Sequence, residues 1–272
     1  MKKSILITGC SSGIGYDTAH YLDKSIYKVY ATARKQEDVE RLKGEGLDAY
    51  LLDVTSASNI SDILNIVKAD GELYAVFNNA GFGQPGAVED ITTEVLKEQF
   101  ETNFFALHEL TRQSLKIMRK QGYGKIIQHS SVLGIISLRF RGAYNASKYA
   151  IEGLCDTLRQ ELHGSNIFVC TINTGPVKSD FRQNAIEMFK RNVVLNGSVF
   201  EKEYKEELLN SKEEKEKDPF TKNSDVVIKN IVHALESKKP KPRYYNTLAT
   251  HILGGLKRVL TTNMLDRILT KI

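Results

Sequence analysis

The sequence predicts an α/β fold: a single domain built on a doubly wound, mostly parallel sheet of seven strands, with helices on both faces. Two observations lead to this prediction. Short β-branched runs alternate along the chain with longer amphipathic stretches, and the strand-like runs are apolar almost throughout. Continuous apolar strands are typical of parallel sheets buried on both faces. The 272 residues are enough for one such domain, which we expect to span residues 1–272.

The elements follow from these patterns in chain order. Strands are expected at 4–8, 28–33, 48–53, 73–78, 125–130, 167–172 and 243–246, and helices at 14–24, 57–69, 93–121 and 143–163. One segment departs from the alternation. Residues 201–218, EKEYKEELLNSKEEKEKD, are dense in charge, which predicts a solvated helix or mobile loop, with a partner site as the alternative. This segment falls inside an expected substrate-lobe insertion at 178–222.

Composition limits the class of protein. Apolar residues make up 41% of the chain and charged residues 26%, as in ordinary globular proteins. The three cysteines lack close pairs and metal-ligand spacing, so we expect no disulfide framework, no metal and a cytoplasmic location. The start, MKKSILITGCSS, is too short in apolar residues for a secretory signal, and no apolar run is long enough to span a membrane.

The positive charge is concentrated near the C-terminus. The formal net charge is +5, and residues 237–272 hold eight Lys or Arg against one Asp, so the preceding body is nearly neutral. This distribution argues against nucleic-acid binding, which needs basic residues spread over a working face. Residues 247–272 read as two short amphipathic helices in a basic tail. We expect this tail to pack on the domain or across a dimer, with peripheral contact to anionic lipid as the alternative.

The first expected strand runs directly into TGCSSGIG, Thr8 to Gly15, and then into a helix. The spacing G-x-x-x-G-x-G is a variant of the dinucleotide-binding fingerprint, and it predicts a Rossmann-type site. Gly9 allows a tight turn, Gly13 lets the backbone approach a pyrophosphate, and the N–H groups at the helix start face the phosphates. The cofactor contacts expected in this turn are Gly9, Ser11, Ser12, Gly13, Ile14 and Gly15.

The end of the second strand indicates which nicotinamide nucleotide binds. An NAD site usually has an acidic residue there for the ribose 2′-hydroxyl, but this chain has Arg34 followed by Lys35. A guanidinium binds a 2′-phosphate, and the Ser11 hydroxyl can add a hydrogen bond, so NADP(H) is expected over NAD(H). The alternative is that Arg34 is only solvated. Asp53 and Val54, after the third strand, are expected to contact the adenine.

Seven motifs together resemble those of the short-chain dehydrogenase/reductase family, in order and in spacing. They are TGCSSGIG, LDV (52–54), NNAG (78–81), TNFFA (102–106), HSSVLG (129–134), YNASK (144–148) and NTGPVKSDF (173–181). The likeness covers residues 3 to 181 well and is more diffuse afterwards. Within the family, VYATAR and KPRYY resemble a branch that includes 17β-hydroxysteroid dehydrogenases, retinol dehydrogenases and bacterial aldehyde or ketone reductases.

The resemblance implies a catalytic group of Asn103, Ser131, Tyr144 and Lys148. Tyr144 would exchange a proton with the substrate oxygen, and Lys148, four residues on, would lower the pKa of the phenol and hold the nicotinamide ribose. Ser131 would hydrogen-bond the substrate oxygen. Asn103 would hold a water that links Lys148 to bulk solvent. The further cofactor contacts implied are Asn79, Ala80, Gly81, Tyr144, Lys148, Pro176 and Val177.

Two further residues, Thr174 and His129, belong to these motifs. The family commonly has Pro-Gly after the sixth strand, whereas this chain has Thr174-Gly175, which questions the stiffness of that loop rather than activity. His129 could be read as a catalytic base, but its position before the two serines favours a side chain that faces a helix layer.

The implied substrate is an aldehyde, ketone or alcohol on a hydrophobic body. The apolar residues expected to surround it are Leu133, Ile136, Leu138, Phe140 and Phe181. Segments 104–121 and 143–163 correspond to the usual dimer contact of the family, so a homodimer or homotetramer is expected. Two other functions stay open: an NADP-binding redox sensor without turnover, and a membrane-surface protein whose tail carries the main function.

Overall fold

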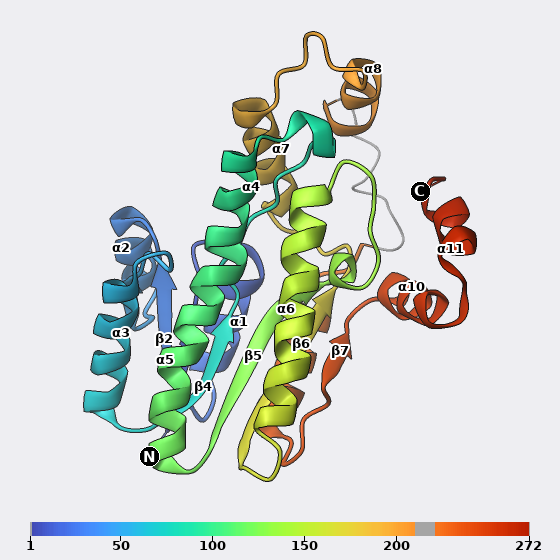
Figure 1. Cartoon of the computed structure of the whole chain (residues 1–272). Coiled ribbons are helices and arrows are strands. Elements are labelled where there is room, and N and C mark those ends of the chain that lie inside the picture. Colours follow the sequence, from blue (N-terminus) through green and yellow to red (C-terminus); the bar gives the residue numbers. More distant parts are fainter. Residues whose placement is uncertain (1, 210–220, 272) are drawn as a thin grey trace.

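The computed structural model describes residues 2–209 and 221–271 and has one seven-stranded parallel sheet (Figure 1). The strand order is β3-β2-β1-β4-β5-β6-β7, so the predicted doubly wound sheet is confirmed. The strands are β1 (Lys3–Ile7), β2 (Tyr27–Ala33), β3 (Ala49–Leu51), β4 (Leu73–Asn78), β5 (Gly124–Ser131), β6 (Ile167–Thr174) and β7 (Arg243–Tyr245). The order reverses between β1 and β4, where a crevice forms beyond the carboxyl ends of the strands in folds of this kind.

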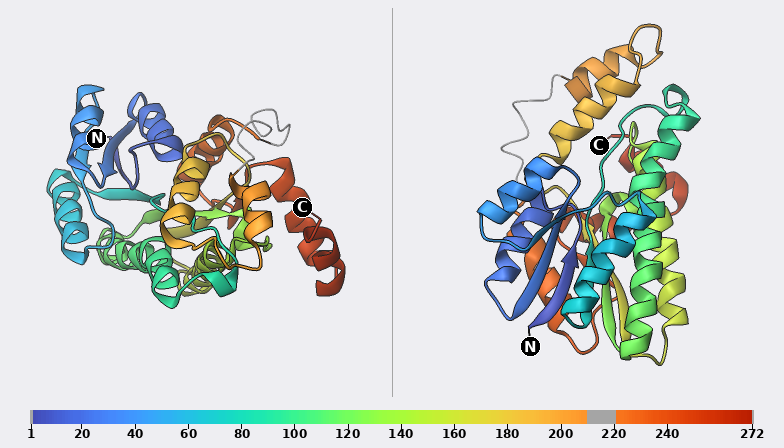
Figure 2. Two further views of the ribbon diagram at one scale, coloured as in Figure 1. Left: turned by 90° about the horizontal axis from the view of Figure 1, so that it is seen from above. Right: turned by 90° about the vertical axis from the view of Figure 1, so that its left-hand side faces the viewer.

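Helices cover both faces of the sheet, as predicted, and each layer has its own apolar core (Figures 1 and 2). On one face lie α1 (Gly13–Asp23), α2 (Gln36–Gly44) and α9 (Asp225–Glu236); on the other lie α3 (Ala57–Asp70), α5 (Ala106–Gln121) and α6 (Gly142–Glu161). The expected helix over 93–121 contains a π-helical turn, η2 (Glu101–Phe105), between α4 (Thr93–Phe100) and α5.

A lobe with its own small core stands beyond the carboxyl ends of the strands (Figure 1). Its helical segments are η1 (Val88–Asp90), α7 (Phe181–Asn192), α8 (Glu201–Glu203) and η4 (Tyr204–Leu209). The expectation of a wholly solvated segment at 201–218 is wrong for Tyr204, which is fully buried against Phe140 and Phe189. The Tyr204 hydroxyl accepts from the Ala87 N–H at 2.7 Å. Residues 210–218 of that expectation lie outside the described residues.

The C-terminal tail forms the two expected helices, α10 (Leu248–Val259) and α11 (Thr262–Leu269). Both pack on the segment that follows β5, which begins with η3 (Val132–Gly134), and together they enclose a fourth apolar cluster. This cluster contains Val132, Ile136, Leu253, Leu256, Leu265 and Leu269. Within the two stretches that the structure describes, no helix has the length and apolarity needed to cross a bilayer.

Candidate active site

The glycine turn between β1 and α1 has the conformation that a dinucleotide site needs. Gly9 has a φ of +71°, which favours glycine, and a Cβ at Gly15 would lie 2.3 Å from the carbonyl oxygen of Gly9. Ser12, the residue before α1, makes no capping bond with its side chain, and the first turn of α1 has no acidic residue. The N–H groups at this helix end therefore fit phosphate oxygens.

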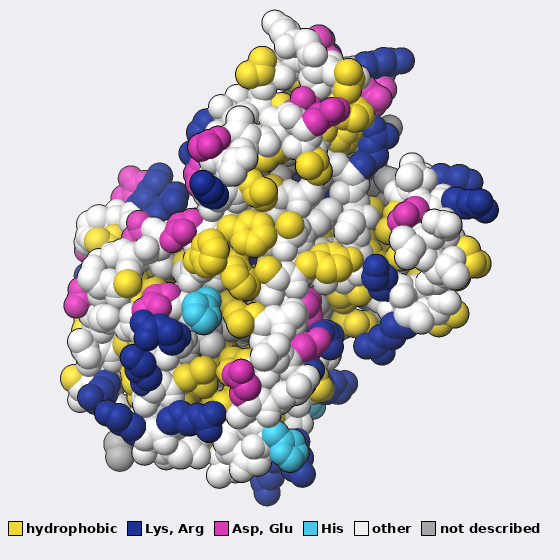
Figure 3. Space-filling view, in the orientation of Figure 1, with side chains coloured by type: hydrophobic (Ala, Val, Ile, Leu, Met, Phe, Trp, Pro, Cys, Tyr) yellow, Lys and Arg dark blue, Asp and Glu magenta, His cyan; other side chains and the backbone are white. Residues whose placement is uncertain are grey.

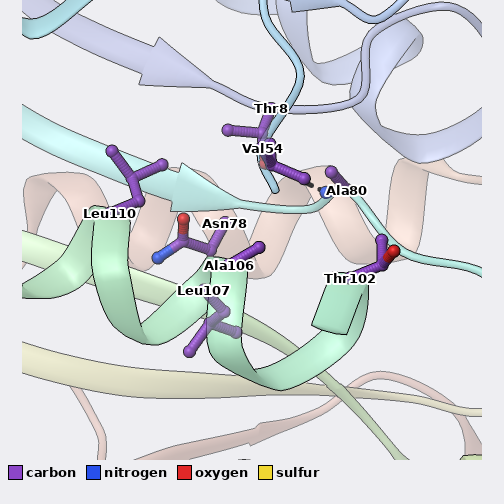
Figure 4. Close-up of a pocket in the computed structure, with 8 residues that line it drawn as sticks. All are labelled: Thr8, Val54, Asn78, Ala80, Thr102, Ala106, Leu107 and Leu110. Atoms are coloured by element: carbon purple, nitrogen blue, oxygen red, sulfur yellow. Dashed lines mark hydrogen bonds between the residues drawn. The ribbon is translucent and has the colours of Figure 1, made fainter. Parts of the chain in front are cut away.

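Thr8 and Asn79 hold this turn against the end of β4. The Thr8 hydroxyl accepts from the Ala80 N–H at 3.0 Å (Figure 4) and from the Asn79 N–H at 2.9 Å. The Asn79 amide donates to the carbonyl oxygens of Thr8 and Gly9, both at 3.0 Å. The sequence reading included Asn79 and missed Thr8, although a hydroxyl directly before Gly9 was a signal for it. A cavity of about 10 Å³ beside Thr8, Val54 and Ala80 has room for one water at most.

Charged residues lie where the adenosine half of a nucleotide would bind. Arg34 is exposed at the end of β2, and its charge is one of the causes that lower the pKa of Asp53, after the larger effect of the Thr55 hydroxyl. Among the described residues Arg34 forms no ion pair, so its guanidinium is available for a 2′-phosphate. Arg41, which the sequence reading missed, donates to the carbonyl oxygen of Ser11 at 2.6 Å and so braces the turn.

Tyr144 and Lys148 lie one turn apart on α6 and are both buried. The Lys148 ammonium lies 5.5 Å from the centre of the Tyr144 ring and donates to the carbonyl oxygen of His129 at 2.6 Å. The Ser131 hydroxyl, at the end of β5, donates to the Thr174 carbonyl oxygen at 3.3 Å and lies near enough to Tyr144 to lower the pKa of the phenol. The Ser130 hydroxyl has no such role, since it is buried without a hydrogen-bond partner within the described residues. The structure thus brings Ser131, Tyr144 and Lys148 together.

Burial sets the protonation states of this group. It raises the pKa of Tyr144 to about 12, against the opposing effect of the Ser131 hydroxyl. It also lowers the pKa of Lys148 to about 8, against the opposing charge of Glu152. We expected Lys148 to lower the pKa of Tyr144, and the structure corrects this, because loss of water around the phenol has the larger effect. The Tyr144 phenol is therefore neutral near pH 7.

Asn103 lies in the π-helical turn and is buried. Its side-chain oxygen accepts from the Phe82 N–H at 3.1 Å, and its amide donates to the Phe82 carbonyl oxygen at 2.9 Å and to the Ser147 hydroxyl at 3.3 Å. The side chain thereby fixes the loop after β4, which contains Gly81, beside α6. The water relay implied by the resemblance remains a proposal, since these bonds occupy the side chain itself.

His129 lies partly buried between the ends of β4 and β6 and is neutral. Burial, followed by the charge of Lys148, lowers its pKa to about 3. Its ring nitrogens lie 2.9 Å from the Asn79 side-chain oxygen and 2.9 Å from the Thr174 hydroxyl. The ring lies 5.8 Å from that of Phe77, on the face of the sheet that α1 and α9 cover, as expected, and its hydrogen-bond partners come from the ends of β4 and β6. Thr174, in place of the family's proline, supplies a hydroxyl that proline lacks.

The loop after β6 lies over the glycine turn. A Cβ at Gly13 would be 3.2 Å from the Ser179 Cβ, and Pro176 accepts from the Lys222 N–H at 3.1 Å. Val177 forms a parallel β-bridge with Lys222 as well. Farther along, the Phe181 ring lies 5.4 Å from that of Tyr144, so Phe181 reaches the reacting end of the site.

Two of the five apolar residues expected around the substrate have a different role. Ile136 is fully buried in the tail cluster, and Phe140 is buried in the lobe core with a φ of +58°. Both are core residues, because the tail and the lobe each need an apolar anchor on the segment after β5. Leu133 and Leu138 pack partly exposed beside the tail cluster, and Phe181 is partly exposed beside Tyr144.

Comparisons with known proteins agree with this geometry. The family model described as short chain dehydrogenase matches residues 3–189. The chain is 39% identical over 271 residues to an uncharacterized oxidoreductase, YbbO, of Escherichia coli, covering 99% of this chain and 94% of that protein. It is 36% identical over 189 residues to human retinol dehydrogenase 8, covering 66% of this chain and 60% of that protein. A solved structure, "ElxO with NADP Bound", has a TM-score of 0.74 at 24% identity, covering 90% of this chain and 97% of that one.

The chain therefore belongs to the short-chain dehydrogenase family. It is an oxidoreductase of that family, whose members use a nicotinamide cofactor and a small-molecule substrate. The branch with retinol dehydrogenase 8 among its members is the one that the sequence motifs resemble.

Proposed function

We propose that the protein interconverts a carbonyl and an alcohol on a hydrophobic substrate with NADP(H), as an alcohol:NADP⁺ oxidoreductase. The observation that supports this best is the neutral, buried phenol of Tyr144, with the Ser131 hydroxyl near it and Lys148 one helical turn away. A proton donor of this kind suits a substrate oxygen that gains negative charge during reduction.

A nicotinamide nucleotide held by the glycine turn and Lys148 would supply the hydride for the carbonyl carbon. Tyr144 donates its proton to the carbonyl oxygen, and Ser131 hydrogen-bonds the same oxygen as charge develops on it. Lys148, with its pKa lowered to about 8, is protonated near neutral pH and can return a proton to Tyr144. Asn103 holds the Phe82 loop beside α6, through its bonds to Phe82 and to the Ser147 hydroxyl. In the reverse direction the same groups remove the proton of an alcohol.

The cofactor preference is proposed from Arg34 and Ser11. Arg34 is exposed and forms no ion pair among the described residues, and Ser11 lies in the turn next to it. A guanidinium and a hydroxyl together suit a 2′-phosphate, which an NAD site would repel with a carboxylate. The NADP bound by the solved structure of similar fold is compatible with this preference.

The substrate is proposed to be hydrophobic because of three apolar side chains that are at least partly exposed. Phe181 lies beside Tyr144, and Leu133 and Leu138 belong to the segment that follows Ser131. The name of retinol dehydrogenase 8 refers to a substrate of that chemical class. A homodimer or homotetramer through α5 and α6 remains part of the proposal, with Phe105 half exposed at the start of that surface.

The proposal is tested with purified protein and a panel of long-chain and short-chain aldehydes and ketones, with NADPH or NADH followed by absorbance. We expect NADPH oxidation with hydrophobic carbonyls at a higher kcat/KM than with small polar ones. NADPH binding without turnover on any member of the panel would favour the redox-sensor function instead.

A further inference from the structure

The outer side of the tail presents apolar side chains that nothing in the described structure covers. In α10, Leu248, Ile252 and Val259 lie within about 40° of one another around the helix and are exposed, whereas Leu253 and Leu256 face the tail cluster. In α11, the exposed Met264 and Ile268 are one turn apart. We call these five residues, Leu248, Ile252, Val259, Met264 and Ile268, the tail face.

Positive charge surrounds this face. Figure 3 shows dark blue Lys and Arg side chains together with yellow hydrophobic ones on the tail, at the right of the molecule. In the described tail the basic residues outnumber the acidic ones. They are Lys257, Arg258, Arg267 and Lys271, against Asp266 alone. At about 100° per residue, Lys257 lies about 160° from the centre of the tail face on α10, whereas Arg258 lies about 100° from it and Arg267 lies about 80° from the centre of the Met264 and Ile268 pair on α11. Arg258 and Arg267 therefore flank the face, and none of the ion pairs found among the described residues involves either.

Lys257 and Arg258 also border a groove. This groove has a volume of about 280 Å³ and lies between α10, β7, η3 and the middle of α6, where Tyr245, Gly134 and Glu152 line it. Its third basic residue, Arg243, is already paired with Glu152 at 2.7 Å and with Asp156 at 2.6 Å. The two unpaired cations therefore supply the net positive charge of the groove, which suits an anionic group between apolar neighbours.

We propose that the tail face docks on an anionic phospholipid bilayer, with the apolar residues at the acyl boundary and the flanking Arg258 and Arg267 on lipid phosphates. Short amphipathic helices with an apolar stripe and flanking cations bind membranes in this way. A symmetric contact between two copies through the same face would oppose like charges, which disfavours a dimer there. This docking goes beyond the proposed function and requires none of its catalytic residues.

Docking of the tail would also determine where the segment that follows Ser131, part of the expected substrate site, lies. The tail packs on the residues that follow Ser131, through Val132 and Ile136. A bilayer under the tail face would therefore hold the segment that follows Ser131 close to the lipid surface. Hydrophobic carbonyl compounds partition into that phase.

The test is co-sedimentation of the full-length protein with vesicles of phosphatidylcholine alone or mixed with phosphatidylglycerol, at low and high salt. Binding is expected to the mixed vesicles and to weaken in high salt, where the Debye length falls from about 10 Å to about 3 Å. Leu248→Ser/Ile252→Ser/Val259→Ser should lose binding at both salt levels. Arg258→Glu/Arg267→Glu should weaken binding to mixed vesicles by about tenfold or more at low salt.

Two control variants test whether binding depends on the tail face itself or on any exposed apolar or basic residues of the protein. Ile26→Ser/Leu51→Ser/Val194→Ser changes side chains that are 60%, 51% and 77% exposed, against 60%, 48% and 83% for the three tail residues. Arg119→Glu/Lys120→Glu reverses two exposed cations at the end of α5. Both controls should sediment like the parent, with circular dichroism showing that every variant is folded.

Three results would overturn the proposal: a parent protein that stays in solution with mixed vesicles, a tail variant that sediments like the parent, or a tail variant that turns an oligomer into a monomer in analytical ultracentrifugation. The last result would make the face a subunit interface. NADPH oxidation on a water-soluble aldehyde is measured in parallel, so failure of the proposed reaction is seen separately from failure to bind vesicles.

Discussion

The Nε2 atom of His129 lies 2.9 Å from the hydroxyl of Thr174 and accepts its proton. The assignment follows from Asn79, whose amide donates to the carbonyls of Thr8 and Gly9 and whose oxygen must therefore accept from Nδ1 of His129. The neutral imidazole then has its proton on Nδ1. A continuous polar chain thus connects the glycine turn with the end of β6, and it explains how the loop stays ordered without the family's proline.

Replacing Thr174 by valine should leave a buried imidazole nitrogen without a donor. We expect a loss of about 1–3 kcal/mol in the free energy of unfolding, measured by urea denaturation. Thr174→Ser retains the hydroxyl and should stay within about 0.5 kcal/mol of the parent. Equal stability of the valine and serine variants would show that the hydrogen bond to His129 has no energetic role.

The rate of carbonyl reduction should depend on pH through Lys148. Since the pKa of Lys148 is lowered to about 8 while that of Tyr144 is raised to about 12, kcat/KM should fall as pH rises through about 8 with the phenol still protonated. Glu152 opposes the lowering of the Lys148 pKa, so Glu152→Gln should move the fall to lower pH. A pH profile that is unchanged in a folded Glu152→Gln variant would remove Lys148 as its origin.

The charge at the end of β2 should determine the choice of nucleotide. Arg34→Asp should lower kcat/KM for NADPH by about tenfold to a hundredfold relative to NADH, because a charge-assisted hydrogen bond becomes a repulsion. Lys35→Asp is the matched control, since Lys35 is exposed and already paired with Glu37 at 3.1 Å. A larger shift at Lys35 than at Arg34 would reassign the 2′-phosphate contact.

Tyr204 should anchor the lobe over the site. Tyr204→Phe removes the bonds of its hydroxyl to the Ala87 N–H and to Asp90, leaving a buried N–H unpaired. We expect a loss of about 1–3 kcal/mol in stability and a rise in KM for the carbonyl substrate with a smaller change in kcat. Lys205→Ala, at the exposed next residue, should change neither quantity. An unchanged KM in Tyr204→Phe would separate the lobe from substrate binding.

The sheet was predictable because its strands are apolar runs separated by amphipathic helices, a pattern set by local residue order. The grouping of Ser131, Tyr144 and Lys148 was predictable because motif spacing carries it. The burial of Tyr204 was not predictable, because its segment is mainly charged and one aromatic residue among charged neighbours produces no apolar pattern. Nor could the sequence give the protonation of Tyr144 or the bond from Thr174 to His129. Both depend on distant residues and on how much water the fold excludes.

The central claim is that Tyr144 donates the proton, and the most direct measurement compares Tyr144→Phe with Tyr149→Phe. Tyr149 lies on the same helix, and its hydroxyl donates to the carbonyl oxygen of Ile135 at 2.5 Å, outside the proposed catalytic group. With an aldehyde that the parent reduces, Tyr144→Phe should lower kcat by about 10²–10⁴-fold while NADPH affinity, measured by fluorescence, stays within about twofold. Tyr149→Phe should retain most activity. A Tyr144→Phe variant that reduces the aldehyde as fast as the parent would contradict the account.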